Sequence, residues 1–379
     1  MSKIKTIVMI GTTAACFYGF RAELIKNLNL KNIIVYAFTT DNDALELEKI
    51  SVLGAIPISY QLNRGGLNPL ADMLATFKLA QQIKQLKPDL VFSYFAKPVI
   101  FGTLAAKIAK VPKIIGMLEG LGYTFTDQPN GLSSKTKLIK AIQVFLYKLA
   151  LPKLDQLILL NHDDKTDLLI NNDIEVKETY ILGGIGLDLN QYKYSPVTKD
   201  LPIQFLFIGR LLKEKGIHDF IAAAQIVKEK FPQTTFTVLG GIDEANLGAL
   251  TQGELTQYID QNVIDYPGHV ENIAEWIKQS HVFVLPSYRE GVPRSTQEAM
   301  AIGRPVITTD VPGCRDTVID GVNGFLVPKW NPQALAEKMT YFIEHPEQVR
   351  MMGDQSHKIA IEKFDAEKVN QRLLEILGI

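Results

Sequence analysis

The fold is decided by the stretch Val282-Phe-Val-Leu285-Pro-Ser-Tyr-Arg-Glu290-Gly-Val-Pro-Arg-Ser-Thr-Gln-Glu298-Ala-Met-Ala-Ile302-Gly-Arg-Pro305-Val-Ile-Thr308. Its first four residues are apolar and predict a buried strand, residues 295–302 predict a short helix, and residues 305–308 predict a second strand. Two strands joined by a crossover helix run parallel, and helices cover both faces of a parallel sheet. The stretch therefore predicts one βαβ unit of a doubly wound α/β domain.

Two glutamates flank the start of the predicted helix, with seven residues between them. Glu290 lies on a Gly-Pro loop, where a backbone can approach a ligand, and Glu298 lies on the first turns of the helix, near the positive end of its dipole. An anion site with carboxylates on both sides fits a sugar joined to a diphosphate. Capping and dipole residues give the same pattern, so the rest of the chain must decide between the two interpretations.

The same alternation of short apolar runs and amphipathic helices fills the chain. It restarts after Gly183-Gly-Ile-Gly-Leu-Asp188, and the polar stretch 190–202, which contains two prolines, predicts a linker. We expect two doubly wound Rossmann-like domains, at 1–188 and 203–355, facing a cleft at the carboxyl ends of their strands. Residues 189–202 would link them, and residues 356–379 would form closing helices that pack back on the first domain.

Composition limits the function. The chain has 379 residues, 46% of them hydrophobic, enough for two cores, and its net charge of −1 disfavours a general nucleic-acid binder. Residues 1–200 hold 23 Lys and Arg against 18 Asp and Glu, whereas residues 201–379 hold 17 against 23, so the halves are expected to meet different partners. The two cysteines lie in different halves, which favours a reducing compartment over a disulfide framework. We expect neither a transmembrane helix nor a signal peptide.

Cations follow the first predicted strand of the second domain. Gly209 and Arg210 come directly after that strand, and Lys215 precedes the next helix. Two cations on one loop suit a diphosphate, because Arg can bind it in bidentate fashion. Solvated surface charges are the alternative, and a position on the same sheet edge as Glu290 and Glu298 argues against it.

The first domain offers a weaker set of candidates. Small residues including Gly11 and Thr12 follow its first strand and allow close approach to a ligand, and Arg21 follows on the next helix. Arg21 points either at the cleft or into a surface ion pair with Glu23 or another acid. Glu119 follows a buried strand and precedes two glycines, which suits either a general base or substrate-hydroxyl acceptor, or a structural bond to loop amides.

A lysine-rich helix is predicted within residues 132–154. It carries apolar residues at helical spacing and no acid, so it is either a membrane-surface helix or a core helix with a solvated lysine face. Asp41-Asn-Asp43 resembles a metal motif of some sugar transferases, but a helix cap is the stronger interpretation. The six histidines lack zinc-ligand spacing, and we expect no metal. His269, at the end of a strand, is a candidate contact for a nucleotide base.

Together these motifs resemble glycosyltransferase family 4, which has the two-domain GT-B fold. The resemblance spans the chain and is strongest over 203–328, in Gly209-Arg210…Lys215-Gly216, Pro286-Ser-Tyr-Arg-Glu290-Gly-Val-Pro-Arg-Ser-Thr-Gln-Glu298 and Asp320-Gly-Val-Asn-Gly-Phe-Leu-Val-Pro328. It implies that Arg210 and Lys215 neutralise the donor diphosphate. It also implies that Glu298 holds the ribose, that Glu290 holds the donor sugar, and that the anomeric configuration is retained without a metal.

A closer resemblance, to members that extend undecaprenyl-diphosphate-linked sugars, rests on Val292-Pro-Arg-Ser-Thr-Gln297 and Glu119-Gly-Leu-Gly-Tyr123. Many family members have a catalytic-cleft histidine in the first domain, whereas the first histidine here is His162. The predicted catalytic residues are Glu290, Arg210, Lys215 and Glu119. The predicted donor-binding residues are Gly11, Thr12, Gly209, His269, Val270, Gly291, Val292, Ser295 and Glu298. The predicted acceptor or membrane residues are Tyr18, Arg21, Lys135, Lys137, Lys140 and Lys148.

The sequence thus predicts a cytoplasmic, peripheral membrane enzyme on the inner face of the cell membrane. It would move a hexose or N-acetylhexosamine from a UDP-sugar to an undecaprenyl-diphosphate-linked saccharide, with no cofactor. Three alternatives stay open: an isomerase resembling UDP-N-acetylglucosamine 2-epimerase, a soluble glycosyltransferase with a non-lipid acceptor, and a non-catalytic sugar-nucleotide binder.

Overall fold

The computed structural model describes residues 4–62, 69–197, 202–243 and 248–379, and it contains two parallel sheets. The first has the order β3-β2-β1-β4-β5-β6-β7 and the second the order β10-β9-β8-β11-β12-β13. Every strand pairs in parallel with its neighbours, as the α/β prediction requires. The strands of the first sheet are β1 (Thr6–Ile10), β2 (Ile34–Thr39), β3 (Ile56–Ser59), β4 (Leu90–Tyr94), β5 (Lys113–Leu118), β6 (Gln156–Leu159) and β7 (Thr179–Ile181). The strands of the second are β8 (Gln204–Ile208), β9 (Thr235–Leu239), β10 (Asp265–Gly268), β11 (Val282–Leu285), β12 (Val306–Thr309) and β13 (Gly324–Val327).

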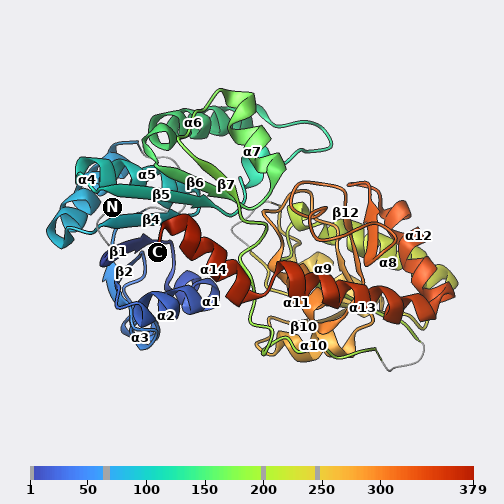
Figure 1. Ribbon diagram of the computed structural model, residues 1–379. Coiled ribbons are helices and arrows are strands. Elements are labelled where there is room, and N and C mark those ends of the chain that lie inside the picture. The colour runs from blue at the N-terminus through green and yellow to red at the C-terminus, as the bar shows by residue number, and fades with distance from the viewer. Residues whose placement is uncertain (1–3, 63–68, 198–201, 244–247) are drawn as a thin grey trace. The chain divides into compact units, whose positions relative to one another are not determined.

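Helices cover both faces of each sheet, because the central strands are apolar on both sides. β4 and β11 are buried along their whole length. Figure 1 shows α4, α5 and α6 on one face of the first sheet and α1, α2 and α3 on the other. The helices before the linker are α1 (Ala14–Phe20), α2 (Ala22–Leu30), α3 (Ala44–Val52), α4 (Pro69–Leu86), α5 (Ala96–Ile108), α6 (Ser134–Ala150) and α7 (His162–Leu168). Those after it are α8 (Ile217–Lys230), α9 (Gln252–Asp260), α10 (Ile273–Gln279), α11 (Arg294–Ile302), α12 (Pro332–Glu344), α13 (Pro346–Lys363) and α14 (Ala366–Leu377).

The chain divides into two compact units. The first comprises Met1–Thr124, Ser133–Ile185 and Val369–Ile379, and the second comprises Phe125–Leu132 and Gly186–Lys368. The sequence placed a linker at 189–202 and a separate closing segment at 356–379. In the structure the described part of that linker stretch packs in the second unit, and only the last eleven residues of the chain pack in the first.

Several elements differ from the predicted ones. Arg21 was expected on a helix, but it lies at a break between two helices, α1 and α2, where its φ is −124° and its ψ is 5°. The sequence analysis missed β7, α7 and α9, although Thr251 and Glu254 form a complete capping box at the start of α9, which is a readable signal. The cap interpretation of Asp43 is confirmed, because its carboxylate accepts from the backbone amides of Leu45 and Glu46.

Candidate active site

Three predicted site segments lie along the carboxyl edge of the second sheet. Gly209 follows β8, His269 and Val270 follow β10, and Glu290 lies on the loop after β11. In a parallel sheet the carboxyl ends of the strands lie on one edge. The neighbouring strands β8 and β11 bring the loops of Gly209 and Glu290 together, and β10 ends on the same edge, separated from β8 by β9. This edge is where doubly wound domains bind ligands, so the segments occupy one candidate site.

Lys215 and Glu290 form the central contact of that site. The Lys215 Nζ atom lies 2.5 Å from Glu290 Oε1, and the two side chains are 24% and 11% exposed. The Ser287 hydroxyl donates to the same carboxylate oxygen at 2.8 Å. The carboxylate is thus held in a fixed orientation beside a cation that is still partly open to solvent.

The backbone explains how residues 75 positions apart are brought to this distance. Gly216 has φ of +76°, and a Cβ built there would lie 2.0 Å from the carbonyl oxygen of Pro286. Only glycine permits such an approach. The amide of Tyr288 also donates to the Glu214 carbonyl at 2.8 Å. The turn that carries Lys215 is therefore fixed against the loop that carries Glu290.

The far side of the Glu290 loop is fixed as well. The amide of Glu290 donates to the Pro312 carbonyl at 3.0 Å. Gly313, with φ of +79°, lies so close that a Cβ there would be 2.3 Å from the Glu290 carbonyl oxygen. Gly291 and Val292 are buried in this packing. The predicted donor loop is a rigid element, which suits precise placement of a ligand.

Glu298 lies on α11 in a different environment. It is 5% exposed, and its Oε1 atom accepts from the Tyr192 hydroxyl and from Arg294 Nε, each at 2.9 Å. Burial raises the pKa of the Glu298 carboxyl, although Arg294 and Tyr192 oppose the shift. The two glutamates are therefore not equivalent: one faces a partly exposed lysine and the other is buried in a hydrogen-bonded cluster.

The remaining predicted donor residues are more exposed. Arg210 is 62% exposed, and its guanidinium makes a 3.4 Å contact with Asp243. His269 is exposed and Val270 half-buried at the end of β10. Ser295 is half-buried on the first turn of α11. These side chains lie on the same sheet edge, but Arg210 is far less restrained than Lys215.

In the first unit, the structure brings together two predicted residues that are 98 positions apart. Arg21 and Glu119 form an ion pair, with side chains 2% and 9% exposed. The Arg21 guanidinium carbon also lies 5.0 Å from the centre of the Tyr94 ring, and burial raises the pKa of that tyrosine well above its usual value. Arg21 was predicted either to face the cleft or to form a surface ion pair. The structure shows an ion pair, and it is buried.

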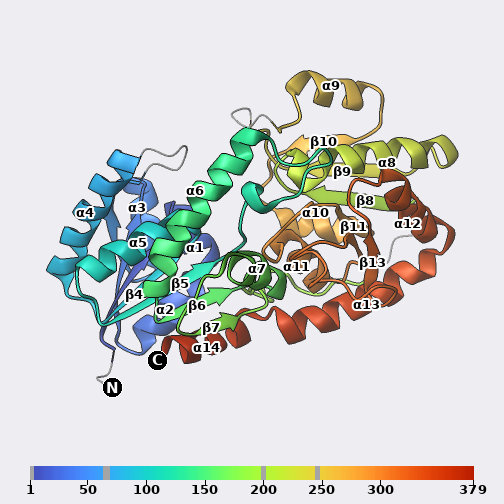
Figure 2. The same cartoon turned by 90° about the horizontal axis from the view of Figure 1, so that it is seen from above.

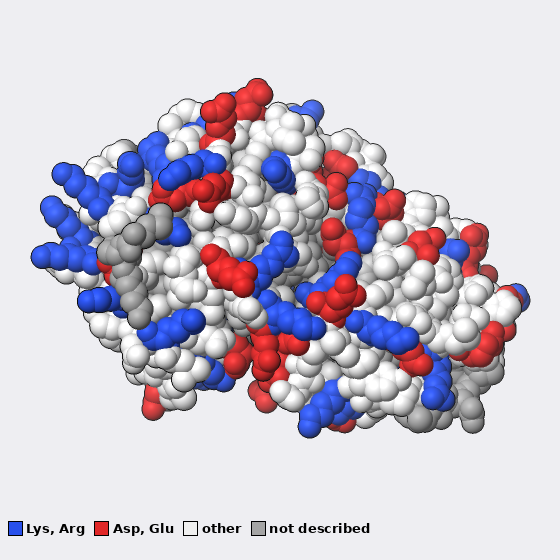
Figure 3. Space-filling model, viewed as in Figure 1, with Lys and Arg blue, Asp and Glu red and all other residues white. Residues whose placement is uncertain are grey.

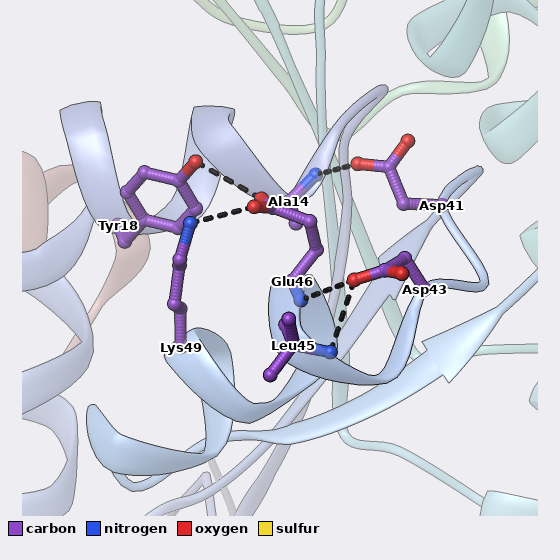
Figure 4. Close-up of polar contacts among 7 residues, drawn as sticks. All are labelled: Ala14, Tyr18, Asp41, Asp43, Leu45, Glu46 and Lys49. Carbon is purple, nitrogen blue, oxygen red and sulfur yellow. Dashed lines mark hydrogen bonds and ion pairs between the residues drawn. The ribbon is translucent and has the colours of Figure 1, made fainter.

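Gly11 and Thr12 lie at the carboxyl end of β1 and are held by neighbouring strands. The Tyr60 hydroxyl donates to the Gly11 carbonyl at 2.6 Å, and the Thr40 amide donates to the Thr12 carbonyl at 2.7 Å. Tyr18, predicted as an acceptor residue, points from α1 toward α3 (Figure 4). Its hydroxyl donates to Glu46 Oε2 at 3.0 Å, and Lys49 Nζ lies 5.1 Å from the centre of its ring.

The lysine-rich helix exists as predicted and corresponds to α6. Lys135, Lys137 and Lys148 are exposed, and Lys140 is half-buried. In the described ranges, no helix is long and apolar enough to cross a membrane. The same residues include no group of three or more His, Cys, Asp or Glu side chains placed to hold a metal ion.

The sequence analysis missed two contributors to the site. Tyr192 was assigned to a polar linker, yet it is 6% exposed and hydrogen-bonded to Glu298. An aromatic residue inside an otherwise polar stretch was the available signal. Ser287 lay within the motif around Glu290 without a role. No local pattern identifies it, because its partner is fixed only when the loop folds.

Comparison with known proteins fits this geometry. A family model for glycosyl transferase 4-like proteins matches residues 7–161, and one for glycosyl transferases group 1 matches residues 192–359. The fold and these matches define a glycosyltransferase with the GT-B architecture. The chain belongs to glycosyltransferase family 4, as its motifs predicted.

Three similar proteins are informative. The N,N'-diacetylbacillosaminyl-diphospho-undecaprenol alpha-1,3-N-acetylgalactosaminyltransferase of Campylobacter jejuni is 28% identical, over 98% of this chain and 97% of that one. The capsular polysaccharide biosynthesis glycosyltransferase CapM of Staphylococcus aureus is 27% identical, over 92% and 90%. The solved structure of HepE from Anabaena with UDP and glucose superposes with a TM-score of 0.76 at 21% identity, over 99% and 100% of the two chains.

Proposed function

We propose that this glycosyltransferase moves a sugar from a UDP-sugar to a saccharide linked to undecaprenyl diphosphate, with retention of anomeric configuration and without a metal. It would act in the assembly of a surface polysaccharide or glycan, in the cytoplasm at the inner face of the cell membrane. The observation that carries the donor half of the proposal is the Lys215–Glu290 contact on the ligand edge of the second sheet. A cation and a carboxylate side by side offer one group for a diphosphate and another for sugar hydroxyls.

In this mechanism the bond between the anomeric carbon and the diphosphate oxygen breaks, and a bond to the acceptor hydroxyl oxygen forms on the same face. The proton of the acceptor hydroxyl leaves with the departing diphosphate. Lys215 and Arg210 stabilise the charge that develops on that diphosphate, which is the main electrostatic demand of the step. Glu290 orients the donor sugar, and Glu298 accepts hydrogen bonds from the ribose.

The acceptor half rests on the relatives and on charge. The Campylobacter relative acts, by its name, on a sugar linked to diphospho-undecaprenol. The first 200 residues carry the excess of Lys and Arg, and four lysines of α6 are wholly or partly exposed. A basic surface suits the diphosphate of the acceptor and the anionic headgroups around it. Glu119 remains the predicted acceptor-side residue, held in position by Arg21.

Mass spectrometry of the products tests the reaction. The protein is offered a panel of UDP- and other nucleotide-sugars with synthetic undecaprenyl-diphosphate saccharides, with and without EDTA. We expect one UDP-sugar to add a single residue to the lipid-linked acceptor, equally well in EDTA, and we expect NMR of the product to show retained configuration. A new nucleotide sugar formed without acceptor, or transfer only to a lipid-free saccharide, contradicts the proposal.

A matched pair of variants tests the assignment of Glu290. Glu290→Gln keeps the size of the side chain and removes its charge, and we expect transfer to fall by at least about a hundredfold. Glu275→Gln is the control, because that glutamate is exposed on the surface of α10 and its side chain forms an ion pair with Lys278 of the same helix. Equal activity of the two variants would remove Glu290 from the site.

A further inference from the structure

An apolar groove runs along the first unit between α4, α5 and α6. It consists of two adjoining cavities of about 510 and 470 Å³, which share Phe101, Ile142 and Leu146 as lining residues. Helices α4 and α6 both pack on α5; residues of α5 and α6 line both cavities, and residues of α4 line the second. Figure 2 shows the three helices side by side on one face of the sheet. Each cavity has the size of a small-molecule site.

The groove exposes large apolar side chains to solvent. Met73, Phe77 and Phe145 are 54%, 49% and 59% exposed, and all three line the second cavity. Leu138, at 62%, lines the first. A contiguous patch of this kind on a folded domain indicates an apolar ligand or partner. All of these residues belong to the first unit.

Lysines border both cavities. Lys97 and Lys135 line the first, and Lys107 and Lys153 line the second, whereas Asp72 is the only acid among the described lining residues. Burial lowers the pKa of Lys97. Lys and Arg side chains also gather on the surface around α4 (left in Figure 3). The groove therefore favours an occupant that is both apolar and anionic.

The direction of the groove relates it to the site. Ala96 and Lys97 begin α5, one residue beyond the end of β4, and Tyr123 and Thr124 lie a few residues beyond the end of β5. The first cavity thus opens at the carboxyl edge of the first sheet, the edge where Arg21 and Glu119 also lie. Helix α5 runs from there to Ile108, which lines the second cavity about 18 Å further on. The groove leads away from the ligand edge along the length of α5.

We propose that this groove binds the polyprenyl chain of the acceptor, with the diphosphate at the Lys97–Lys135 end and the chain running toward Ile108. The inference rests on the proposed function and adds that the enzyme recognises the hydrocarbon chain itself, not only the sugar and the diphosphate. A narrow, concave groove fits a single extended chain, whereas a bilayer surface needs no cavity. Four bordering lysines and one acid match a lipid whose only charges are those of its diphosphate.

Two substitutions in α6 test the groove while leaving the fold intact. Ile142→Asn makes the shared wall polar, and Leu146→Trp fills the space between the cavities. Both residues are half-buried, so neither change breaks the core. Ala141→Asn is the matched control, because Ala141 is exposed on the same helix and lines neither cavity. Circular dichroism and the melting temperature verify that all three variants are folded.

The assay compares two acceptors with the same sugar diphosphate, one carrying an undecaprenyl chain and one a six-carbon alkyl chain. We expect both groove variants to lose at least about tenfold in kcat/KM for the long-chain acceptor and to keep wild-type rates for the short one. The control should match wild type on both. Equal losses on both acceptors, or no loss, overturn the proposal. Loss of flotation with phosphatidylglycerol vesicles at an unchanged long-to-short ratio also overturns it, because the groove would then contact the bilayer.

A binding measurement separates this inference from the proposed reaction. Undecaprenyl phosphate is offered in detergent micelles without any donor, and bound lipid is detected by native mass spectrometry. We expect wild type and Ala141→Asn to retain the lipid, and Ile142→Asn and Leu146→Trp to lose most of it. If lipid binds in this pattern but no donor transfers sugar, the inference of a lipid-binding groove is supported and the proposed reaction is contradicted. If wild type transfers sugar but retains no lipid, the groove fails alone.

Discussion

Replacement of Lys215 by alanine is the sharpest test of the donor site. The Lys215 Nζ atom is 2.5 Å from Glu290, and the side chain is only 24% exposed, so its charge acts in a partly desolvated setting. Two unit charges 4 Å apart interact by about 4 kcal/mol at an effective dielectric constant of about 20. Loss of one preorganised contact to a developing anion costs about 3–4 kcal/mol in measured cases. We therefore expect kcat/KM for the nucleotide sugar to fall by about 10²–10³.

The control lies two residues away. Lys213 is on the same short turn but is exposed, and Lys213→Ala should stay within about threefold of wild type. Lys215→Arg, which keeps the charge but not the point geometry, should recover part of the loss. Initial rates are measured by release of the nucleoside diphosphate, with melting temperatures as the check on folding. A folded Lys215→Ala enzyme whose kcat/KM lies within threefold of Lys213→Ala would refute the electrostatic role.

Three further predictions concern the structure around the site. Gly216→Ala should lower the free energy of unfolding in urea by about 2–4 kcal/mol, because φ is +76° and the new Cβ would lie 2.0 Å from a backbone oxygen. Gly241→Ala is the control and should lower it by less than about 0.5 kcal/mol, because no atom lies within 4 Å of the new Cβ. Burial raises the pKa of Glu298 above 4.5, so its protonated form stabilises the fold at low pH and this contribution is lost as the pH rises through the raised pKa. Glu298→Gln should therefore gain stability relative to wild type as the pH rises above 4.5, as measured by urea unfolding at a series of pH values. Burial raises the pKa of Cys314 to about 12, so a thiol reagent should modify it only after unfolding, and rapid labelling of the native protein would contradict that environment.

Local patterns predicted the fold because the information lies within short stretches. Strands such as β4 and β11 are apolar on both faces, and helices between them satisfy the crossover rule without reference to distant residues. The position of the ligand-binding edge is predictable for the same reason, because the carboxyl ends of all strands in a parallel sheet lie on one edge. This is why Gly209, Arg210 and Glu290 could be assigned to one edge before the structure was known.

Local sequence patterns could not predict contacts between residues that are far apart along the chain. The Arg21–Glu119 pair joins positions 98 apart, and the Tyr192–Glu298 bond joins positions 106 apart. Each depends on which strands become neighbours and on how closely the loops approach. The break between α1 and α2 has the same origin, because Arg21 leaves helical geometry where its side chain enters the buried pair. A helical pattern alone extends through such a residue.

The lysine-rich helix agrees with the interpretation of a core helix with a solvated lysine face, and its role at a membrane surface stays a prediction. One face of α6 does pack, since Tyr147 and Ala150 are buried, and its lysines do lie in solvent. What the pattern could not show is that α4 and α5 leave the apolar residues between those faces uncovered. Amphipathic periodicity identifies the apolar face of a helix, but it does not say how much of that face other helices bury.

Glu290, before α11, and Glu298, within it, lie in different environments, and this difference favours separate roles. Glu298 is buried and its known bonds fall on one oxygen, from Tyr192 and Arg294, so it is oriented before any ligand arrives. Glu290 shares its oxygen with a lysine that remains partly exposed. When a diphosphate binds, the Lys215 ammonium has donors to offer it while it keeps Glu290 in place, because an ammonium carries three N–H groups. A buried carboxylate suits a part of the substrate that does not change during the reaction, and a carboxylate paired with a partly exposed cation suits the part that does. This difference supports the proposal that Glu298 holds the ribose and Glu290 the transferred sugar.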